Sequence, residues 1–425
     1  MEQKNDVIIV GSGAAGSTLA DILAKRGVKV LMLEAGRPFA VEGSFQQSVE
    51  MYDAYQLTQH PVMTKEGIIL WRALMAGGSA VVALSNMLPS MAEEFSRFGI
   101  EIADEMAAFL QEAEVDPLPE RLLSSGGKAI RAAGERQGIP FRMMPKAIDP
   151  RKCNRCGNCP YGCAQAARWS PLTSLASAQR AGAVIQYETR VEHVLVESGK
   201  AIGVIAKTGK SRVRYFADRV ILSAGGIGTP IILHNSGISE AGKQLFMDLY
   251  VTVAGTASEI SQVYEPSMSM VNDQFHESDG FILSPYIPVH PKVAFAEYGI
   301  AGFFRNRSHL IGFLAKTKDH CVGTVQPNGR VSKKLTRADK ARLKKGAETA
   351  KKVLIEAGAK PASLLVSKPQ GAHPGGTAAI GKVVDQNLET RIPGLSVCDA
   401  SVFPEAPGLP PIVPLVGLAR WFAKR

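Results

Sequence analysis

Four cysteines within eleven residues form the most reactive pattern in the sequence. Residues 153–163 read CNRCGNCPYGC, so Cys153, Cys156, Cys159 and Cys163 have the spacing C-x2-C-x2-C-x3-C. This is the spacing of the ferredoxin-type run that binds a [4Fe–4S] cluster. The intervening Asn, Gly and Pro residues favour turns, which lets a backbone fold around a cluster. The pattern therefore predicts that these four thiolates ligate an iron–sulfur cluster.

Other uses of the four cysteines are weaker fits. A four-thiolate zinc site usually has two C-x2-C pairs a dozen or more residues apart. Disulfides are rare in a reducing cytoplasm. In ferredoxins the last cysteine of such a run ligates a second cluster, and the chain has no second run, so Cys163 either completes a [4Fe–4S] cluster or leaves a [3Fe–4S] form. Zinc and [3Fe–4S] thus remain alternatives, while Cys321 and Cys398 are predicted to be core thiols.

A glycine-rich turn near the N-terminus predicts a dinucleotide site. Residues 7–10 are expected to form a buried strand, followed by Gly11, Gly13 and Gly16 in the pattern G-x-G-x-x-G and a helix over residues 14–26. A second strand over residues 28–33 ends in Glu34. This context is that of a dinucleotide fingerprint, in which the pyrophosphate lies at the helix N-terminus and the acidic residue binds ribose.

The remainder of the chain favours FAD over NAD. Residues 184–206 are predicted to form a β-meander that leads into a hydrophobic strand over residues 220–223 and a second glycine turn. A dinucleotide fold that is interrupted and completed far downstream is typical of FAD-binding proteins. The predicted fold class is α/β, with a Rossmann-type FAD-binding domain (parallel sheet plus β-meander), a smaller α+β substrate domain and a cysteine-rich insert.

Three further segments carry a resemblance to a known family. They are the C-terminal HPGGTAAIGKVVDQNLETRIPGLSVCDASVFP (373–404), the loop ALMAGGSAVVALSN (73–86) and ILSAGGIGTPIILHNSGI (221–238). Together they resemble the signatures of the glucose–methanol–choline (GMC) oxidoreductases, and they cover the flavin-binding half at independent points.

The resemblance implies a catalytic role for His373. In the family the histidine of H-P-x-G-T faces flavin N5 and handles the substrate hydroxyl proton, a task suited to a near-neutral pKa. Most members have a second histidine or an asparagine about 40 residues later, where this chain has Pro410. Proline has no side-chain group for proton transfer, so Asn86 or a residue of the substrate domain is predicted to replace it.

The cofactor-binding prediction combines this resemblance with local chemistry. Gly77, Gly78 and Ser79 offer backbone N–H groups and close approach. Asp399 can accept hydrogen bonds at a strand end, and a last helix beginning near Pro411 would direct its positive end at the flavin. The full predicted set is Gly11, Gly13, Ala14, Ala15, Gly16, Glu34, Ala35, Gly36, Gly77, Gly78, Ser79, Val191, Ala224, Gly225, Asp399, Ala400, Pro411 and Ile412.

The predicted domain boundaries follow these motifs. Residues 1–140, 176–240 and 366–425 form the FAD-binding domain, with His373 in its C-terminal part. Residues 141–175 form the cysteine-rich iron–sulfur insert, and residues 241–365 form the substrate domain.

These features together predict an FAD-dependent dehydrogenase that oxidises a CH–OH group by hydride transfer to flavin N5. Electrons would leave through the cluster to a one-electron acceptor, because flavin takes two electrons and can release them singly. One alternative is a reductase of C=O or C=C bonds fed by ferredoxin, and another is a non-catalytic electron-transfer subunit. The expected partners are a small-molecule alcohol or carbonyl substrate and an acidic protein such as a ferredoxin. The basic stretch Lys333–Lys352 is predicted to form a helix, whose charged face is either simply solvated or a dock for that protein. A short substrate domain also leaves room for a homo-oligomer or a partner subunit.

Composition excludes several other classes. The net charge is +10, but no basic stripe is interleaved with aromatic residues, so nucleic-acid binding is not expected. There is no apolar run of about 20 residues, so no membrane span is expected. The N-terminus is typical of a first strand rather than a signal peptide, and a cytoplasmic location is expected.

Overall fold

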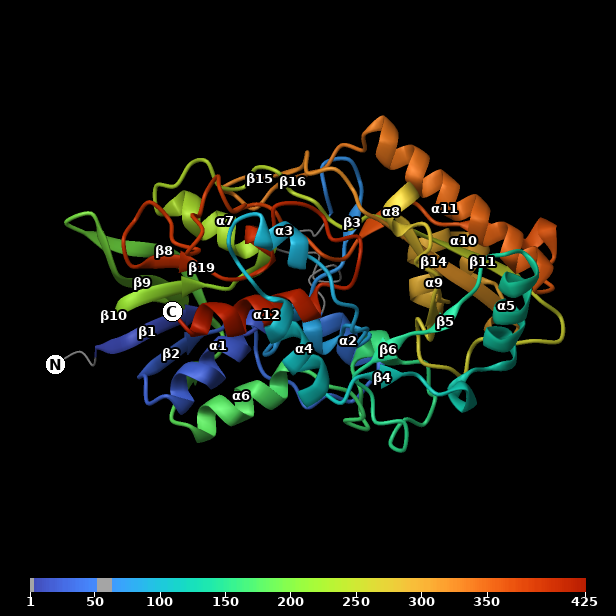
Figure 1. The fold of residues 1–425 in the computed structure, drawn as a ribbon, viewed down its shortest axis with the longest axis horizontal. Helices are drawn as coiled ribbons and strands as arrows, with labels where there is room; N and C mark the ends of the chain where they lie inside the picture. Colours follow the sequence, from blue (N-terminus) through green and yellow to red (C-terminus); the bar gives the residue numbers. More distant parts are fainter. Residues whose placement is uncertain (1–3, 52–62) are drawn as a thin grey trace.

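Two β-sheets at opposite ends of the molecule organise the fold (Figure 1). The computed structural model describes residues 4–51 and 63–425. Each sheet has its own hydrophobic core: one is built around Ile8, Leu222 and Val397, the other around Val253, Phe281 and Phe313. This division matches the expectation that a chain of this length exceeds a single core.

The first sheet is the predicted dinucleotide-binding sheet. Its parallel strands are β7 (Val184–Gln186), β2 (Val30–Leu33), β1 (Asn5–Val10), β10 (Ser211–Leu222) and β19 (Leu395–Val397). The first half of β10 pairs antiparallel with β9 (Lys200–Thr208), which pairs with β8 (Thr189–Glu197). One long strand thus joins the meander to the parallel sheet, as predicted.

A group of packed helices lies beside the first sheet (Figure 1). Helix α1 (Ala14–Lys25) packs against α6 (Pro171–Arg180) and α12 (Ile412–Ala423), and α12 also packs against α4 (Ala103–Glu112). The burial of α1 is nearly continuous over its first seven residues, because it lies between the sheet and these neighbours. The C-terminal helix α12 therefore belongs to the same layer as the N-terminal turn, and Figure 1 shows the two side by side.

The second sheet has the order β13–β14–β11–β18–β3, with β17 beside β11. Its strands are β13 (Phe281–Pro285), β14 (Leu310–Thr317), β11 (Tyr250–Thr256), β18 (Gln370–Gly371), β3 (Ile69–Leu70) and β17 (Leu365–Val366). Helix α11 (Arg337–Glu356) packs against β11, β13, β14 and α5 (Ser125–Arg136). Two strands of this sheet, β3 and β18, come shortly before the loop over residues 73–86 and before His373. These two strands join the second sheet to the half of the molecule that contains the first.

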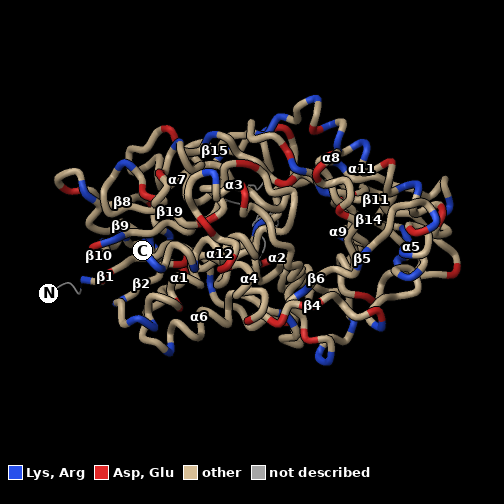
Figure 2. The backbone as a smooth tube through the Cα atoms, viewed as in Figure 1, with Lys and Arg blue, Asp and Glu red and all other residues tan. Residues whose placement is uncertain are grey.

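Helix α11 differs from the basic helix expected over Lys333–Lys352. It begins after Thr336, which with Asp339 forms a capping box. Lys333 lies before the helix with a fully buried side chain that pairs with Asp319 at 2.5 Å, so it is not part of a basic surface. Figure 2 shows that basic residues along the rest of α11 are accompanied by acidic ones.

Shorter elements complete the chain. They are the helices α2 (Phe45–Met51), α3 (Ala92–Ser96), α7 (Gly225–Asn235), α8 (His276–Asp279), α9 (Pro291–Tyr298) and α10 (Ile300–Phe303), and the strands β4 (Asp116–Pro117), β5 (Arg142–Met143), β6 (Pro145–Lys146), β12 (Met270–Val271), β15 (Thr324–Val325) and β16 (Val331–Ser332). Among the described residues, no helix has both the length and the apolar character needed to span a bilayer.

Candidate active site

One large cavity lies between the two halves of the molecule. Its volume is about 1050 Å³, and its walls come from both sheets and the loops that follow their strands. Such a volume suits a dinucleotide cofactor together with part of a substrate. The predicted residues that line it are Gly11, Gly13, Ala14, Ala15, Glu34, Ala35, Gly78, Ser79, Asn86, Val191, Ala224, Gly225, His373, Asp399, Ala400, Pro411 and Ile412. Gly16, Gly36 and Gly77 lie just behind this wall.

The turn between β1 and α1 forms one wall. Gly11 has a φ of +99°, and a Cβ there would lie 2.4 Å from the Ser223 carbonyl oxygen. A Cβ on Gly16 would lie 2.1 Å from the Gly11 carbonyl oxygen. Gly13 faces open space at the start of α1, where the helix N-terminus favours a phosphate. The turn thus has the shape that a pyrophosphate requires.

Two buried carboxylates border the same wall. Glu34 accepts hydrogen bonds from the Ser12 N–H at 2.8 Å and the Gly36 N–H at 2.7 Å. Asp399 accepts from the Gly225 N–H at 2.8 Å and the Thr229 hydroxyl at 2.6 Å, and burial raises its pKa. Both side chains hold these loops together. Glu34 Oε1 and Asp399 Oδ1 each accept a single hydrogen bond, from the Gly36 N–H and the Ser401 N–H, so each keeps a lone pair that a ribose or ribityl hydroxyl could use.

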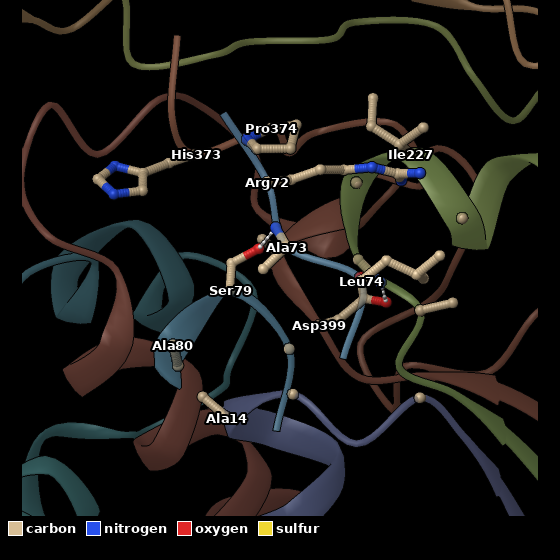
Figure 3. A pocket seen from close by; sticks show the side chains of 18 of the residues that line it. Ala14, Arg72, Ala73, Leu74, Ser79, Ala80, Ile227, His373, Pro374 and Asp399 are labelled. Atoms are coloured by element: carbon tan, nitrogen blue, oxygen red, sulfur yellow. Dashed lines mark hydrogen bonds between the residues drawn. The ribbon is translucent and has the colours of Figure 1, made fainter. Parts of the chain in front are cut away.

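His373 lies across the cavity from Asp399, with Ser79 between them (Figure 3). Its ring, 26% exposed, borders the cavity, and its Nδ1 lies 3.0 Å from Asp248 Oδ2. A carboxylate at Nδ1 favours the tautomer with the proton on Nδ1, which leaves Nε2 as an acceptor. Burial and the Lys316 ammonium lower the pKa of His373, and Asp248 partly offsets them. The imidazole is therefore neutral and basic near pH 7.

Asp248 is fully buried and joins three groups. Besides His373 it contacts Lys316 Nζ at 3.3 Å, and its Oδ1 accepts from the Gly408 N–H at 3.0 Å. Burial alone would raise the pKa of Asp248, but Lys316 and His373 hold it below the usual value. Asp248 therefore stays ionised and anchors His373 to the segment that precedes α12.

Asn86 reaches the cavity but its amide is already engaged. Its Oδ1 accepts a short hydrogen bond from Lys146 Nζ, and its Nδ2 donates to Met268 Sδ at 3.2 Å. Lys146 is 1% exposed, and burial lowers its pKa to about 7. Asn86 thus has little capacity left for a substrate, and the role predicted for it stays a prediction. Pro410 also lines the cavity.

A second buried carboxyl group stands in the wall formed by the second sheet. Glu297 on α9 accepts from the Thr252 hydroxyl at 3.0 Å and the Tyr286 hydroxyl at 3.1 Å. Burial raises its pKa to about 7. Because these hydroxyl donors only partly compensate for lost solvation, the carboxyl group sits near half-protonation at neutral pH.

The four clustered cysteines line a separate, small cavity. Cys153, Cys159 and Cys163 are half-buried and Cys156 is exposed. Burial raises the pKa of Cys153 and of Cys156, so these groups are neutral thiols without a metal. Among the described residues, no three His, Cys, Asp or Glu side chains are grouped to hold a metal ion. The predicted ligand role of these cysteines therefore remains a prediction.

The two cavities share a segment of backbone. Pro160 and Tyr161 line the large cavity, whereas the flanking Cys159 and Gly162 line the small one. The cysteine cavity therefore lies directly behind the wall of the large one.

Comparison with known proteins places this arrangement in a family. The sequence pattern of GMC oxidoreductases matches residues 5–250 and residues 318–419. The chain belongs to the GMC oxidoreductase family. Members are FAD-dependent oxidoreductases that act on alcohols, so the predicted enzyme class and the FAD cofactor are confirmed.

Relatives and solved structures share most of the chain. An uncharacterised protein of Methanocaldococcus jannaschii is 30% identical over 99% of both chains. A long-chain-alcohol oxidase of Arabidopsis thaliana is 25% identical over 99% of this chain and 68% of its own. The crystal structure of a pyridoxine 4-oxidase superposes with a TM-score of 0.76 over 99% of both chains at 16% identity. The predicted GMC fold is therefore confirmed.

Sequence reasoning did not find Asp248, Lys316, Lys146 or Glu297. The available signal was a charged residue inside a mostly apolar stretch, as in LIGFLAKT (310–317). Such a residue is rarely buried without a partner, but its partner lies far away in sequence.

Proposed function

We propose that this GMC oxidoreductase oxidises the CH–OH group of a small-molecule alcohol, with His373 as the proton acceptor. The observation that carries the proposal is the Asp248–His373 pair at the edge of a cavity whose opposite wall is a dinucleotide turn. Two proteins similar to this chain, the long-chain-alcohol oxidase and pyridoxine 4-oxidase, are named for alcohol substrates. Their chemistry supports an alcohol as the substrate class here.

The chain's residues fit FAD. The open side of Gly13 at the α1 N-terminus would hold the pyrophosphate, and Glu34 would bind a ribose hydroxyl. Ser79 and Asp399 border the space between this turn and His373, and the N-terminus of α12 at Ile412 faces the same cavity. Bound FAD would supply a hydride acceptor at N5.

His373 would receive the proton that the hydroxyl group loses as its carbon is oxidised. Asp248 fixes the ring so that Nε2 is the free nitrogen and stabilises the imidazolium that forms. The lowered pKa of His373 keeps the base unprotonated at neutral pH. General-base catalysis of this kind contributes about 10²–10⁴ in rate.

We further propose that Cys153, Cys156, Cys159 and Cys163 hold a [4Fe–4S] cluster, which would supply a one-electron carrier behind the cavity wall. The shared segment at Pro160 and Tyr161 supports this position. Zinc is less favoured, because a four-thiolate zinc site usually has two C-x2-C pairs a dozen or more residues apart. A [3Fe–4S] form remains the alternative if Cys163 does not ligate.

An acidic one-electron acceptor such as a ferredoxin would meet the protein at the cysteine segment rather than at α11. Cys156 is exposed there, and the nearby Arg151 and Lys152 are exposed and outnumber Asp149, the carboxylate with which both pair. This local excess of positive charge supports the proposed exit.

The proposal is tested on protein purified without oxygen. FAD absorbance is followed during addition of a panel of primary alcohols, and iron, zinc and acid-labile sulfide are measured per FAD. Bleaching by an alcohol, with close to four irons and four sulfides, is expected. Bleaching by reduced ferredoxin but by no alcohol would instead favour the reductase of C=O or C=C bonds, and a sample without iron would remove the proposed electron exit.

A further inference from the structure

A buried lysine borders the cavity in which the second polar group of the active site is missing. Lys316 is on β14, its side chain is 3% exposed, and it lines the large cavity beside His373. Pro410, whose side chain offers no hydrogen-bonding group, borders the same cavity. We infer that Lys316 is a second catalytic group, whose ammonium binds and polarises the substrate oxygen that exchanges its proton with His373. This inference rests on the proposed alcohol oxidation.

The hydrogen bonds of Lys316 leave donors unused. Its Nζ lies 3.3 Å from Asp248 Oδ2 and 3.4 Å from His373 Nδ1. Because Nδ1 donates its own proton to Asp248, it cannot also accept one from Lys316. Within the described part of the chain, Asp248 is thus the single acceptor for an ammonium with three N–H groups. Because Lys316 lines the large cavity, its remaining N–H groups can donate to a ligand there.

The free-energy cost of burying the Lys316 ammonium indicates a functional role for its charge. An ammonium removed from water is strongly destabilised unless its partners compensate. Here the one carboxylate partner also serves His373 and the Gly408 N–H. An oxygen of a bound substrate would supply the acceptor that the protein lacks.

The geometry lets one oxygen contact both groups. The two nitrogens of an imidazole are roughly 2 Å apart, so Lys316 Nζ is at most about 6 Å from His373 Nε2, which two hydrogen bonds to one oxygen can span. Asn86 and Glu297 already have partners: Asn86 contacts Lys146 and Met268 and keeps one amide N–H, and Glu297 accepts from two hydroxyl groups.

The step balances without a further reactant. The hydroxyl proton would pass to His373 Nε2, and the C–O bond would become a carbonyl as the carbon loses its hydrogen with the electron pair, for which bound FAD would supply the hydride acceptor. Lys316 keeps its protons and donates a hydrogen bond to the oxygen while negative charge develops on it. Removal of one such preorganised donor costs about 10²–10³ in kcat in other enzymes.

Chemical rescue tests the role without an assumption about the natural substrate. Lys316→Ala, purified with FAD bound, is titrated with sulfite, an anion that adds to flavin N5 and bleaches it. We expect sulfite to bind at least tenfold more weakly to Lys316→Ala than to the wild type, and propylammonium chloride to restore most of the loss while sodium chloride does not. Leu314→Met, a change two residues away in the same cavity wall, should leave sulfite affinity within about twofold of the wild type.

Two results would overturn the inference: unchanged sulfite affinity in Lys316→Ala, or a loss that propylammonium does not repair. If Lys316→Ala does not retain FAD, Lys316→Arg provides the test, since a retained cation should keep sulfite affinity within tenfold of the wild type. Failure of every alcohol to reduce wild-type FAD would count against the proposed function alone, because the sulfite comparison needs no alcohol. With a reactive alcohol in hand, Lys316→Ala should lower kcat more than it raises KM.

Discussion

The two walls of the large cavity are built on different principles. The FAD-side wall is made mainly of backbone, with turns at Gly11 and Gly78 and the start of α1, and its buried carboxylates Glu34 and Asp399 accept hydrogen bonds from backbone N–H groups. The opposite wall carries the buried ionisable side chains of Lys316 and Glu297, and Asp248 contacts Lys316 behind it. Added side-chain atoms should disrupt the shape of the backbone wall, whereas removal of a charge should disrupt the electrostatics of the charged wall.

The difference also separates binding from chemistry. The FAD-side wall, which we propose binds the cofactor, has a shape set by short local motifs. The charged wall shifts pKa values and carries His373, the proposed base, and those properties depend on groups brought together by folding. Variants in the FAD-side wall should therefore lose FAD, whereas variants in the charged wall should lose turnover.

The largest effect is expected from Gly11→Ala. The added methyl group would lie 2.4 Å from the Ser223 carbonyl oxygen at a φ of +99°, which costs at least about 2–4 kcal/mol in strain and overpacking. We expect protein with little or no FAD, measured by absorbance after gel filtration. Gly27→Ala is the control, because its φ is +80° with no atom within 4 Å of the new Cβ; equal FAD loss in both would attribute the effect to backbone conformation alone.

His373→Asn should come next, with a fall of about 10²–10⁴ in kcat and normal FAD content. The Asp248 carboxylate and Lys316 can still pair, so thermal stability should change little. The measurement is the rate of FAD reduction by a reactive alcohol. His193→Asn alters another histidine that lines the same cavity and should reduce FAD at close to the wild-type rate. If His373→Asn reduces FAD at the wild-type rate, His373 is not the proton acceptor.

Cys156→Ser should change the function proposed for the small cavity and leave that of the large cavity intact. We expect alcohol-dependent FAD reduction to remain, while electron transfer to a one-electron acceptor falls at least tenfold and iron per FAD decreases. Iron analysis and stopped-flow absorbance measure the two effects. Cys398→Ser, at a buried thiol that does not line the small cavity, should keep its iron. Unchanged iron in Cys156→Ser would mean that this cysteine is not a ligand.

Glu297→Gln should have the smallest effect, on stability and its pH dependence. The pKa of Glu297 is raised to about 7 by burial, so the folded protein holds this proton more tightly than the unfolded chain does. The wild type therefore loses up to roughly 3 kcal/mol as pH rises from about 4.5 to 7. Glu297→Gln should unfold at a temperature a few degrees higher than the wild type at pH 8, with little difference at pH 4.5. A stabilisation that is equal at both pH values would contradict a raised pKa.

Local sequence predicted the FAD-side wall well. The turn at Gly11 to Gly16, the following helix and the meander were expected and are present, because each depends on neighbours within about 35 residues. Helix α11 was also expected, but its start was placed too early, since the Lys333–Asp319 pair is a tertiary contact. The replacement for the polar residue missing at Pro410 was left between Asn86 and an unspecified residue of the substrate domain, because the contact of Asn86 with Lys146 is a tertiary one that the sequence does not reveal.

The sequence by itself determined the family and the cofactor, because these depend on residue types at fixed short spacings, and it also led to the proposal of His373 as the base. Only the tertiary structure decided what surrounds His373. Asp248, Lys316 and Gly408 come from three distant segments, and the strength of a charge interaction depends on burial and distance, which spacing along the chain does not encode. The same holds for the cysteines: their spacing suggests a cluster, but folding alone places their cavity against the wall of the large one.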